Sequence, residues 1–163
     1  MSTPPAWLPD LIEFTDYGGN WDDYVDAIYT AFHDDFHRSQ ITFDGIRLSA
    51  KRHPEIDGKS ATFWHITSSG RTEEERLPDL ERCKRVLWPR AIIENSTDAS
   101  ILRWPSSKYR NRTVLWLKEH DYMVIIEHRS GYCMLWTAFC VEREHTRQKY
   151  QKEYDAYIAS QST

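Results

Sequence analysis

Residues 113–141 read as three consecutive β-strands joined by two short turns, and this stretch limits the possible folds more than any other. The runs TVLWLK, YMVIIEH and YCMLWTAFCV are rich in β-branched and aromatic residues and contain no proline. Residues 119–121 and 129–131 have the length and the residue types of hairpin turns. Strands joined so closely run antiparallel, so the stretch predicts a β-meander on which the rest of the chain packs.

Side chains alternate between the two faces of a strand, which predicts the residues that share a face. On the third run, strict alternation puts Thr137 in one row with Leu135 and Phe139, as a lone hydroxyl among apolar groups. On the second run, Glu127 and His128 stand near the end of the strand, where a cleft can open. These three polar residues are candidates for a site, although polar residues at strand ends are more often simply solvated.

The chain before the meander begins with an irregular lead-in, residues 1–19, which holds three prolines and a Gly-Gly pair. Asn20 is placed to cap a helix whose apolar residues recur at helical spacing as far as Phe36. Asp44 and Gly45 suit the two-residue turn of a hairpin over residues 41–49. The next apolar run, ATFWHITSSG at residues 61–70, is rich in β-formers and predicts another short strand.

Residues 77–93 have a helical pattern that Pro89 should interrupt after Trp88, and residues 101–104 suit one more strand. Residues 142–160 read as a polar helix with a contact stripe of Tyr150, Tyr154, Tyr157 and Ile158. The fold expected is therefore α+β, in which residues 20–163 form a single domain. Its order is an N-terminal helix and hairpin, a central helix, an antiparallel meander sheet and a C-terminal helix.

Charge is distributed unevenly along the 163 residues, although the net charge is only −4. Residues 1–35 hold eight acidic residues and no Lys or Arg, whereas residues 82–112 hold eight Lys or Arg and two acidic residues. A basic segment on an acidic protein is compatible with a local phosphate site, because the binding of polyanions depends on local potential. Attraction between the two segments explains the pattern equally well.

The three cysteines, Cys83, Cys133 and Cys140, are odd in number and form no C-x-x-C pair, which indicates a reducing compartment without disulfides. No run approaches the roughly 18 to 20 apolar residues that span a membrane, and the first residues lack the pattern of a signal peptide. We therefore expect a cytoplasmic protein with no membrane partner.

Two histidine arrangements bear on metal binding and on proton transfer. His33 and His37 are four residues apart on the first helix, but Asp34 stands where an H-E-x-x-H motif has its glutamate and no third ligand is evident. We expect no metal and no other cofactor. His65 stands at the centre of the run at 61–70, where its near-neutral pKa would suit proton transfer, although a lone His is more often structural.

A helix ahead of a short hairpin, the runs TFWHITSSG and LERCKRVLWPRAIIE, and a late meander ending in LWTAF together form a recognisable order. This order resembles the phage-associated branch of the metal-independent ribonuclease superfamily, which includes barnase, EndoU, colicin and RelE-type toxins. The resemblance covers roughly residues 32–141. It implies a toxin-like endoribonuclease from a phage or prophage, in which RNA phosphate lies on the sheet among a His, basic residues and a late Ser or Thr.

Carried to this sequence, the resemblance implies that His65 transfers a proton while the ribose 2′-hydroxyl attacks phosphorus to give a 2′,3′-cyclic phosphate. His128 or Glu127 would be the second proton carrier. Phosphoryl oxygens would be stabilised by Arg82 or Arg85, by Arg112 and by Thr137. The remaining RNA contacts expected are Thr67, Lys84, Trp88, Lys108, Tyr109 and Arg110. The partners implied are RNA, with tRNA as one candidate, and a neutralising protein.

Two other classes of function fit the same sequence. The first is a non-catalytic antitoxin, immunity or phage inhibitor protein that binds a basic partner through its acidic, aromatic-rich surface. The second is a small-ligand-binding domain in which His65 and the arginines hold an anion without turning it over.

Overall fold

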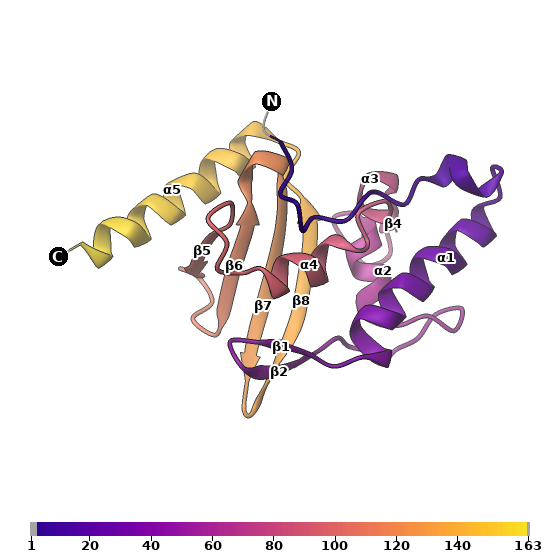
Figure 1. Cartoon of the computed structure of the whole chain (residues 1–163), viewed down its shortest axis with the longest axis horizontal. Helices are drawn as coiled ribbons and strands as arrows, with labels where there is room; N and C mark the ends of the chain where they lie inside the picture. Colours follow the sequence, from indigo (N-terminus) through magenta and orange to yellow (C-terminus); the bar gives the residue numbers. More distant parts are fainter. Residues whose placement is uncertain (1–2, 163) are drawn as a thin grey trace.

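The computed structural model describes residues 3 to 162 and shows an α+β fold, as the sequence predicts (Figure 1). Six strands form one mixed sheet in the order β1-β2-β8-β7-β6-β5. All neighbours are antiparallel except β2 and β8, which are parallel. The strands are β1 (Ile41–Phe43), β2 (Ile46–Ser49), β5 (Leu102–Pro105), β6 (Arg112–Leu117), β7 (Tyr122–Arg129) and β8 (Tyr132–Cys140).

The predicted meander is confirmed as β6, β7 and β8 in the middle of the sheet. The turn from β6 to β7 is a short 3-10 segment, η3 (Lys118–His120), followed by Asp121 in the left-handed region at φ 51°. The turn from β7 to β8 uses Gly131 at φ 82°, a backbone angle that glycine adopts without strain. Local turn chemistry therefore fixes the pairing of these strands. The predicted hairpin is also confirmed as β1 and β2, with Asp44 and Gly45 at positive φ.

A β-bulge makes the alternation expected for β8 wrong. Ile125 of β7 lies opposite Thr137, but the next residue, Ile126, lies opposite Leu135, so Trp136 is an extra residue in β8. A bulge of this kind shifts the residues beyond it to the opposite face. Leu135 therefore lies in the core on one side of the sheet, whereas Thr137 faces the other side, with Ile125.

The sheet separates two apolar cores. The larger core lies on the face against which α2 (Ala61–Thr67) and α4 (Trp88–Glu94) pack, and α1 (Trp21–His33), which Figure 1 shows beside α2, extends it through ring contacts with Phe63. The smaller core lies on the other face, under α5 (Glu144–Gln161), and consists of Trp104, Val114, Trp116, Met123 and Val141. Of the stripe predicted for α5, Tyr150, Tyr154 and Tyr157 pack on this core, whereas Ile158 is exposed.

The sheet curls so that its two edges approach each other. Arg103 of β5 forms an ion pair with Asp44 in the β1–β2 turn, although β5 and β1 are the outermost strands. The Arg103 guanidinium also lies 4.7 Å from the ring centre of Phe43. These contacts hold the curled shape on which the larger core packs.

The first predicted helix is confirmed as α1, and Asn20 caps it by accepting a hydrogen bond of 3.0 Å from the amide of Asp23. The helix continues into a π-helical turn, η2 (Asp34–Arg38). Arg90 of α4 donates to the carbonyl oxygen of Asp35 and to the hydroxyl of Ser39, at 2.7 and 2.6 Å. This side chain fastens the end of η2 to α4.

The lead-in contains a 3-10 turn, η1 (Phe14–Tyr17), and its apolar residues pack against the larger core. Its backbone accepts hydrogen bonds from two buried aromatic side chains. Trp88 donates to the carbonyl of Pro9 at 3.0 Å, and Tyr24 donates to that of Ile12 at 2.8 Å. The lead-in is therefore held in place by the helical layer.

The strand expected at residues 61–70 is wrong, because the segment forms the helix α2. Its buried residues are Thr62, Phe63, Ile66 and Thr67, a spacing that suits one face of a helix. Packing of this face against the sheet overrides the preference of β-branched and aromatic residues for strands. Only two residues of the expected strand remain extended, in β3 (Ser68–Ser69), which pairs with β4 (Leu77–Pro78).

The helix expected over residues 77–93 is two short helices, α3 (Leu80–Cys83) and α4. Asp79 caps α3 by accepting from the amides of Glu81 and Arg82. Pro89 stands in the first turn of α4, where its missing amide costs no intrahelical bond, so it begins a helix and does not kink one. None of the helices in residues 3–162 is long and apolar enough to cross a membrane.

Asp35 provides a test of the packing between η2 and α4. Burial raises the pKa of Asp35 from its ordinary value of 3.8 to about 6, against an opposing effect of Arg90. The folded state therefore disfavours the ionised carboxylate, and this cost grows as the pH rises from about 4 to about 6. We expect Asp35→Asn to raise the free energy of unfolding at pH 8 by about 1 kcal/mol, after allowance for partial exposure. At pH 3 both side chains are neutral and the two proteins should match.

Urea unfolding at pH 3 and pH 8 measures the difference. An equal change in the free energy of unfolding at both pH values would contradict the raised pKa of Asp35.

Candidate functional site

The residues proposed from the sequence fall into three separate groups. The first group lies on α2, α3, α4 and the turn between α3 and α4, on the side of the larger core: His65, Thr67, Arg82, Lys84, Arg85 and Trp88. The second is His128 alone, which also faces the larger core. The third consists of Arg112, Glu127 and Thr137 on the opposite face of the sheet and of Lys108, Tyr109 and Arg110 in the loop between β5 and β6.

Arg82 holds the turn that ends α2. Its guanidinium donates to the carbonyl oxygen of Ser68 at 2.6 Å, and Arg76 donates to the same oxygen at 2.6 Å. Arg76 also donates to the carbonyl of His65 at 2.6 Å. Cations that bind the last carbonyls of a helix stabilise its C-terminus. This is a structural role for Arg82, distinct from the phosphate contact expected from the sequence.

The side chain of His65 is partly buried beside these arginines. Burial lowers the pKa of His65, and the charge of Arg76 lowers it further. The hydroxyl of Thr67 is buried and donates to the carbonyl of Phe63 at 2.7 Å. Thr67 therefore satisfies the helix backbone and does not face an RNA strand.

The remaining cations of the first group are paired with acidic residues. Arg85 lies 3.1 Å from a carboxylate oxygen of Glu81 and 5.0 Å from the ring centre of Trp88. Lys84 is paired with the same Glu81 at 3.1 Å and with Glu13 at 3.8 Å. Trp88 is buried and its indole binds the lead-in. These three side chains hold α3 and α4 to their neighbours.

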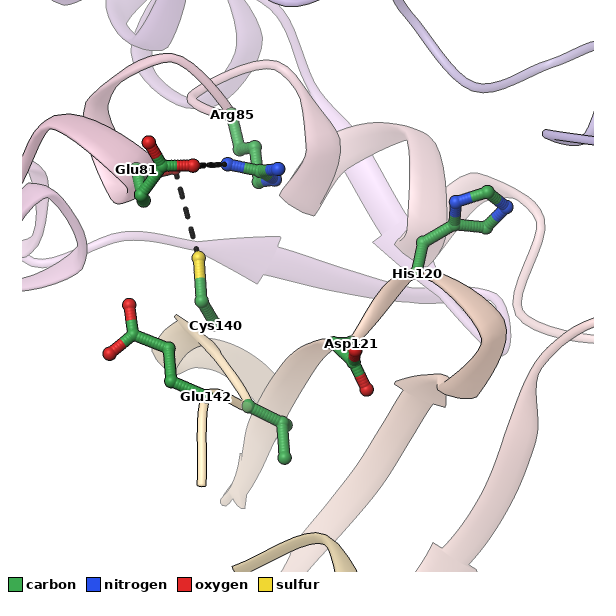
Figure 2. Close-up of a pocket in the computed structure, with 7 residues that line it drawn as sticks. Glu81, Arg85, His120, Asp121, Cys140 and Glu142 are labelled. Atoms are coloured by element: carbon green, nitrogen blue, oxygen red, sulfur yellow. Dashed lines mark hydrogen bonds and ion pairs between the residues drawn. The ribbon is translucent and has the colours of Figure 1, made fainter. Parts of the chain in front are cut away.

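A cavity of about 310 Å³ lies beside Arg85 (Figure 2). Its lining includes the carboxylates of Glu81, Asp121 and Glu142 and one guanidinium, that of Arg85. Figure 2 shows Arg85 directed towards Glu81. The thiol of Cys140 donates to the carbonyl of Glu81 at 3.7 Å, and burial raises the pKa of this thiol to about 11. The lining is acidic and its thiol is protonated, so it suits neither phosphate binding nor nucleophilic attack.

Both ring nitrogens of His128 are occupied within the fold. Nε2 lies 2.8 Å from the hydroxyl of Thr113, and Nδ1 lies 3.4 Å from the sulfur of Cys133. The ring also lies beside Phe43 in the larger core. His128 is therefore on the face opposite to Glu127, its neighbour in sequence, as strand alternation requires.

Thr137 and His65 also lie on opposite sides of the sheet. Thr137 pairs with Ile125 on the face that α5 covers, whereas α2 packs on the other face of β8. The fold thus brings together Arg112 and Glu127 of the expected catalytic set but keeps His65, Arg82, Arg85 and His128 away from them.

Glu127 is buried between two arginines at the end of β7. Only 4% of Glu127 is exposed, and its carboxylate forms ion pairs with Arg112 at 3.2 Å and with Arg129. Two guanidiniums pair with one carboxylate, so the three groups together carry an excess positive charge, with Arg112 mostly buried and Arg129 partly exposed. Such compensation is what makes a buried carboxylate tolerable.

Arg112 also lies between two aromatic rings. Its guanidinium carbon is 4.0 Å from the ring centre of Tyr109 and 4.0 Å from that of Trp136. Two rings cannot occupy the same side of a guanidinium at that distance, so one ring stacks on each side. Tyr109 and Trp136 are nevertheless 43% and 40% exposed. The two rings therefore remain accessible to a ligand.

Three exposed cations lie on the adjoining loop and strand end. Lys108, Arg110 and Arg129 have exposed side chains, and the Lys108 amine lies 5.3 Å from the ring centre of Tyr109. We call the group formed by Lys108, Tyr109, Arg110, Arg112, Glu127, Arg129 and Trp136 the sheet-end surface. It combines accessible rings with four cations and one carboxylate.

The loop between β5 and β6 presents Lys108, Tyr109 and Arg110. The amide of Ser106 donates to the carbonyl of Arg112 at 2.9 Å, and the amide of Arg112 donates to that of Tyr109 at 3.0 Å. The loop is thus a closed turn at the end of the two strands. These three residues and Arg112 are candidates from the sequence, and the loop that carries the three leads directly into β6.

Sequence reasoning missed Trp136 and Arg129. No sequence motif singled out Trp136, and Arg129 was read as a turn residue. Its position two residues after Glu127 on an extended strand was the signal that could have placed both side chains on one face.

Comparison of the chain with family models, with curated proteins and with solved structures finds no match. Within residues 3–162, no group of three or more His, Cys, Asp or Glu side chains is arranged to hold a metal ion. The pair His33 and His37 has its rings 5.5 Å apart, and His37 lies 3.1 Å from the hydroxyl of Ser60.

Glu127 provides the stability test of the sheet-end surface. Glu127→Ala would leave Arg112 without its carboxylate partner while it is still held between two rings. We expect a loss of about 2 kcal/mol in the free energy of unfolding, below the 3–5 kcal/mol of a fully buried pair because Arg129 is partly in water. Urea unfolding measures this loss.

The matched control is Glu144→Ala, which removes an exposed carboxylate from the first turn of α5. Similar urea midpoints for Glu127→Ala and Glu144→Ala would show that the Glu127 ion pairs contribute nothing to stability.

Proposed function

We propose that this protein binds single-stranded RNA on the sheet-end surface. The observation that carries the proposal is the stack of Arg112 between two accessible rings, Tyr109 and Trp136, with exposed cations on the adjoining loop and strand end. Bases stack on aromatic rings, and Lys or Arg side chains hold the phosphates between them. The surface offers both kinds of group on one face.

The role proposed for each side chain in RNA binding follows from its contacts. Arg112 is covered on both sides by rings and is paired with Glu127, so it spaces the rings and is not a free phosphate ligand. Lys108 and Arg110 lie on the exposed loop and serve as the phosphate contacts, together with the outer part of Arg129. Trp136 provides the stacking surface for a base.

A single strand fits this surface better than a duplex. The rings are side chains on a sheet, and only an unpaired base can present its flat face to them. Stacking alone accepts RNA and DNA. The choice of RNA is supported by the resemblance of the sequence to the ribonuclease superfamily.

The endoribonuclease activity implied by that resemblance stays a prediction. On the sheet-end surface, Glu127 is the carboxylate available as a proton acceptor, and it is occupied by two arginines. His65 and His128 lie on the other side of the sheet. We therefore propose binding as the function and treat cleavage as an outcome to be measured in the same experiment.

The alternative of a non-catalytic protein partner also stays a prediction. One observation favours it, since Trp21 is 38% exposed beside the exposed Asp22 at the start of α1. A basic partner would fit that end of the molecule, which is separate from the sheet-end surface (Figure 1). Trp21 consequently serves as a control in the RNA experiment.

Trp136→Ala should weaken RNA binding about tenfold, the effect expected from the loss of one stacked base. Trp21→Ala removes a tryptophan of almost equal exposure from the opposite end and should leave the affinity unchanged. The measurement is fluorescence anisotropy of a labelled, mixed-sequence single-stranded RNA of 12 nucleotides in EDTA. Absence of binding by the wild-type protein at about 50 mM salt, or equal affinities of the two variants, would overturn the proposal.

The double variant Lys108→Ala, Arg110→Ala tests the phosphate contacts. We expect the slope of log affinity against log salt to become less steep by about 1.4, since each phosphate contact on a single strand contributes about 0.7.

The binding mixtures are then analysed for RNA products ending in 2′,3′-cyclic phosphate. Such products, absent from His65→Ala and Thr137→Ala, would establish the ribonuclease in addition to binding.

A further inference from the structure

One carboxylate of α5 connects the smaller core to the loop of the sheet-end surface. Oε1 of Glu153 accepts a hydrogen bond of 2.9 Å from the indole nitrogen of Trp104 and one of 3.1 Å from the amide of Ser107. Trp104 is only 1% exposed and belongs to the smaller core. Ser107 immediately precedes Lys108 and Tyr109.

We infer that Glu153 is a positioning residue for RNA binding, through which α5 sets the orientation of the loop that contacts the strand. This inference rests on the proposed function. Glu153 does not itself belong to the sheet-end surface, and its charge is of the wrong sign to attract a polyanion.

The hydrogen bonds of the loop show why Glu153 matters. At the far end of the loop, the carbonyl of Asn111 accepts from the amide of His128 in β7 at 2.6 Å, so that end is fixed to the sheet. At the near end, the amide of Ser106 donates to Arg112, within the same turn. The other hydrogen bonds of residues 106–109 stay within the loop or reach Arg112 at the start of β6, whereas the bond from Ser107 to Glu153 ties the loop to α5, outside the β5–β6 pair.

The position of the Tyr109 ring depends on this bond because the ring is two residues further along the chain. A hydrogen bond to an ionised acceptor is among the strong ones in proteins. Without it, the backbone before Lys108 loses its fixed acceptor. Lys108 and Tyr109 then sample orientations in which the ring no longer stacks on Arg112.

The positioning role and simple electrostatics predict opposite changes in RNA affinity when Glu153 is removed. Removal of a negative charge beside a basic loop should strengthen RNA binding if charge alone matters. If Glu153 positions the loop, Glu153→Ala should weaken binding about tenfold, the effect of one displaced stacking contact. Glu153→Gln keeps a carbonyl oxygen for both donors and should bind at least as tightly as the wild-type protein.

The experiment compares these two variants with Asp155→Ala by anisotropy on the same RNA across a series of salt concentrations. Asp155 is an exposed carboxylate on the same helix, and it accepts a hydrogen bond of 2.9 Å from the side chain of Gln151 on that helix. Its removal should slightly strengthen binding. Glu153→Ala should also show a less steep salt dependence, because Lys108 no longer contacts phosphate in a fixed geometry.

Trp104→Phe distinguishes a loss of stability from a loss of loop positioning, because it removes the indole donor to Glu153 and leaves the hydrogen bond from Ser107 in place. Trp104→Phe should retain RNA affinity, with thermal midpoints measured for every variant to confirm that all are folded at the assay temperature. Tighter binding by Glu153→Ala, or equal weakening in Trp104→Phe, would overturn the positioning role. If the wild-type protein fails to bind RNA, the proposed function fails instead.

Discussion

The pairing of β6, β7 and β8 divides the apolar side chains of this protein between two faces, and the other elements cover one face or the other. Val124 and Leu135 lie in the core beneath α2 and α4, whereas Val114 and Met123 lie beneath α5. Burial of a strand on both faces gives the central strands few exposed side chains. The polar groups available for function are consequently those at the strand ends, where the helices no longer cover the sheet.

The sheet-end surface follows from this division. Glu127 lies near the end of β7, yet it is almost fully buried and pairs with two arginines. The cost of removing its charge from water is offset by Arg112 and Arg129. Arg112 is in turn held flat between Tyr109 and Trp136. The ion pair and the stack thus support each other, and the result is an ordered pair of rings in a basic setting.

The bulge at Trp136 gives β8 its part in this arrangement. The extra residue directs the Trp136 ring towards Arg112 and places Thr137 on the face of the smaller core. α5 contributes from the same face through Glu153, which contacts both Trp104 and the β5–β6 loop. The proposed RNA surface is therefore assembled from β6, β7, β8, one loop and one helix that is distant in sequence.

Sequence alone determined the meander, the hairpin and the cap of α1, because each depends on residues that are neighbours in the chain. Gly131, Gly45 and Asn20 act through their own backbone angles or through an amide three residues away. Sequence also placed Tyr109 and Arg110 beside Arg112. Tertiary structure decided that residues 61–67 are a helix, since burial of Phe63 and Ile66 against the sheet overrides local preference. It also decided which candidates share a face. The bulge at Trp136 and the packing of α2 depend on contacts with residues far along the chain. Local sequence preferences do not include the free energy of those contacts, so they predict neither feature.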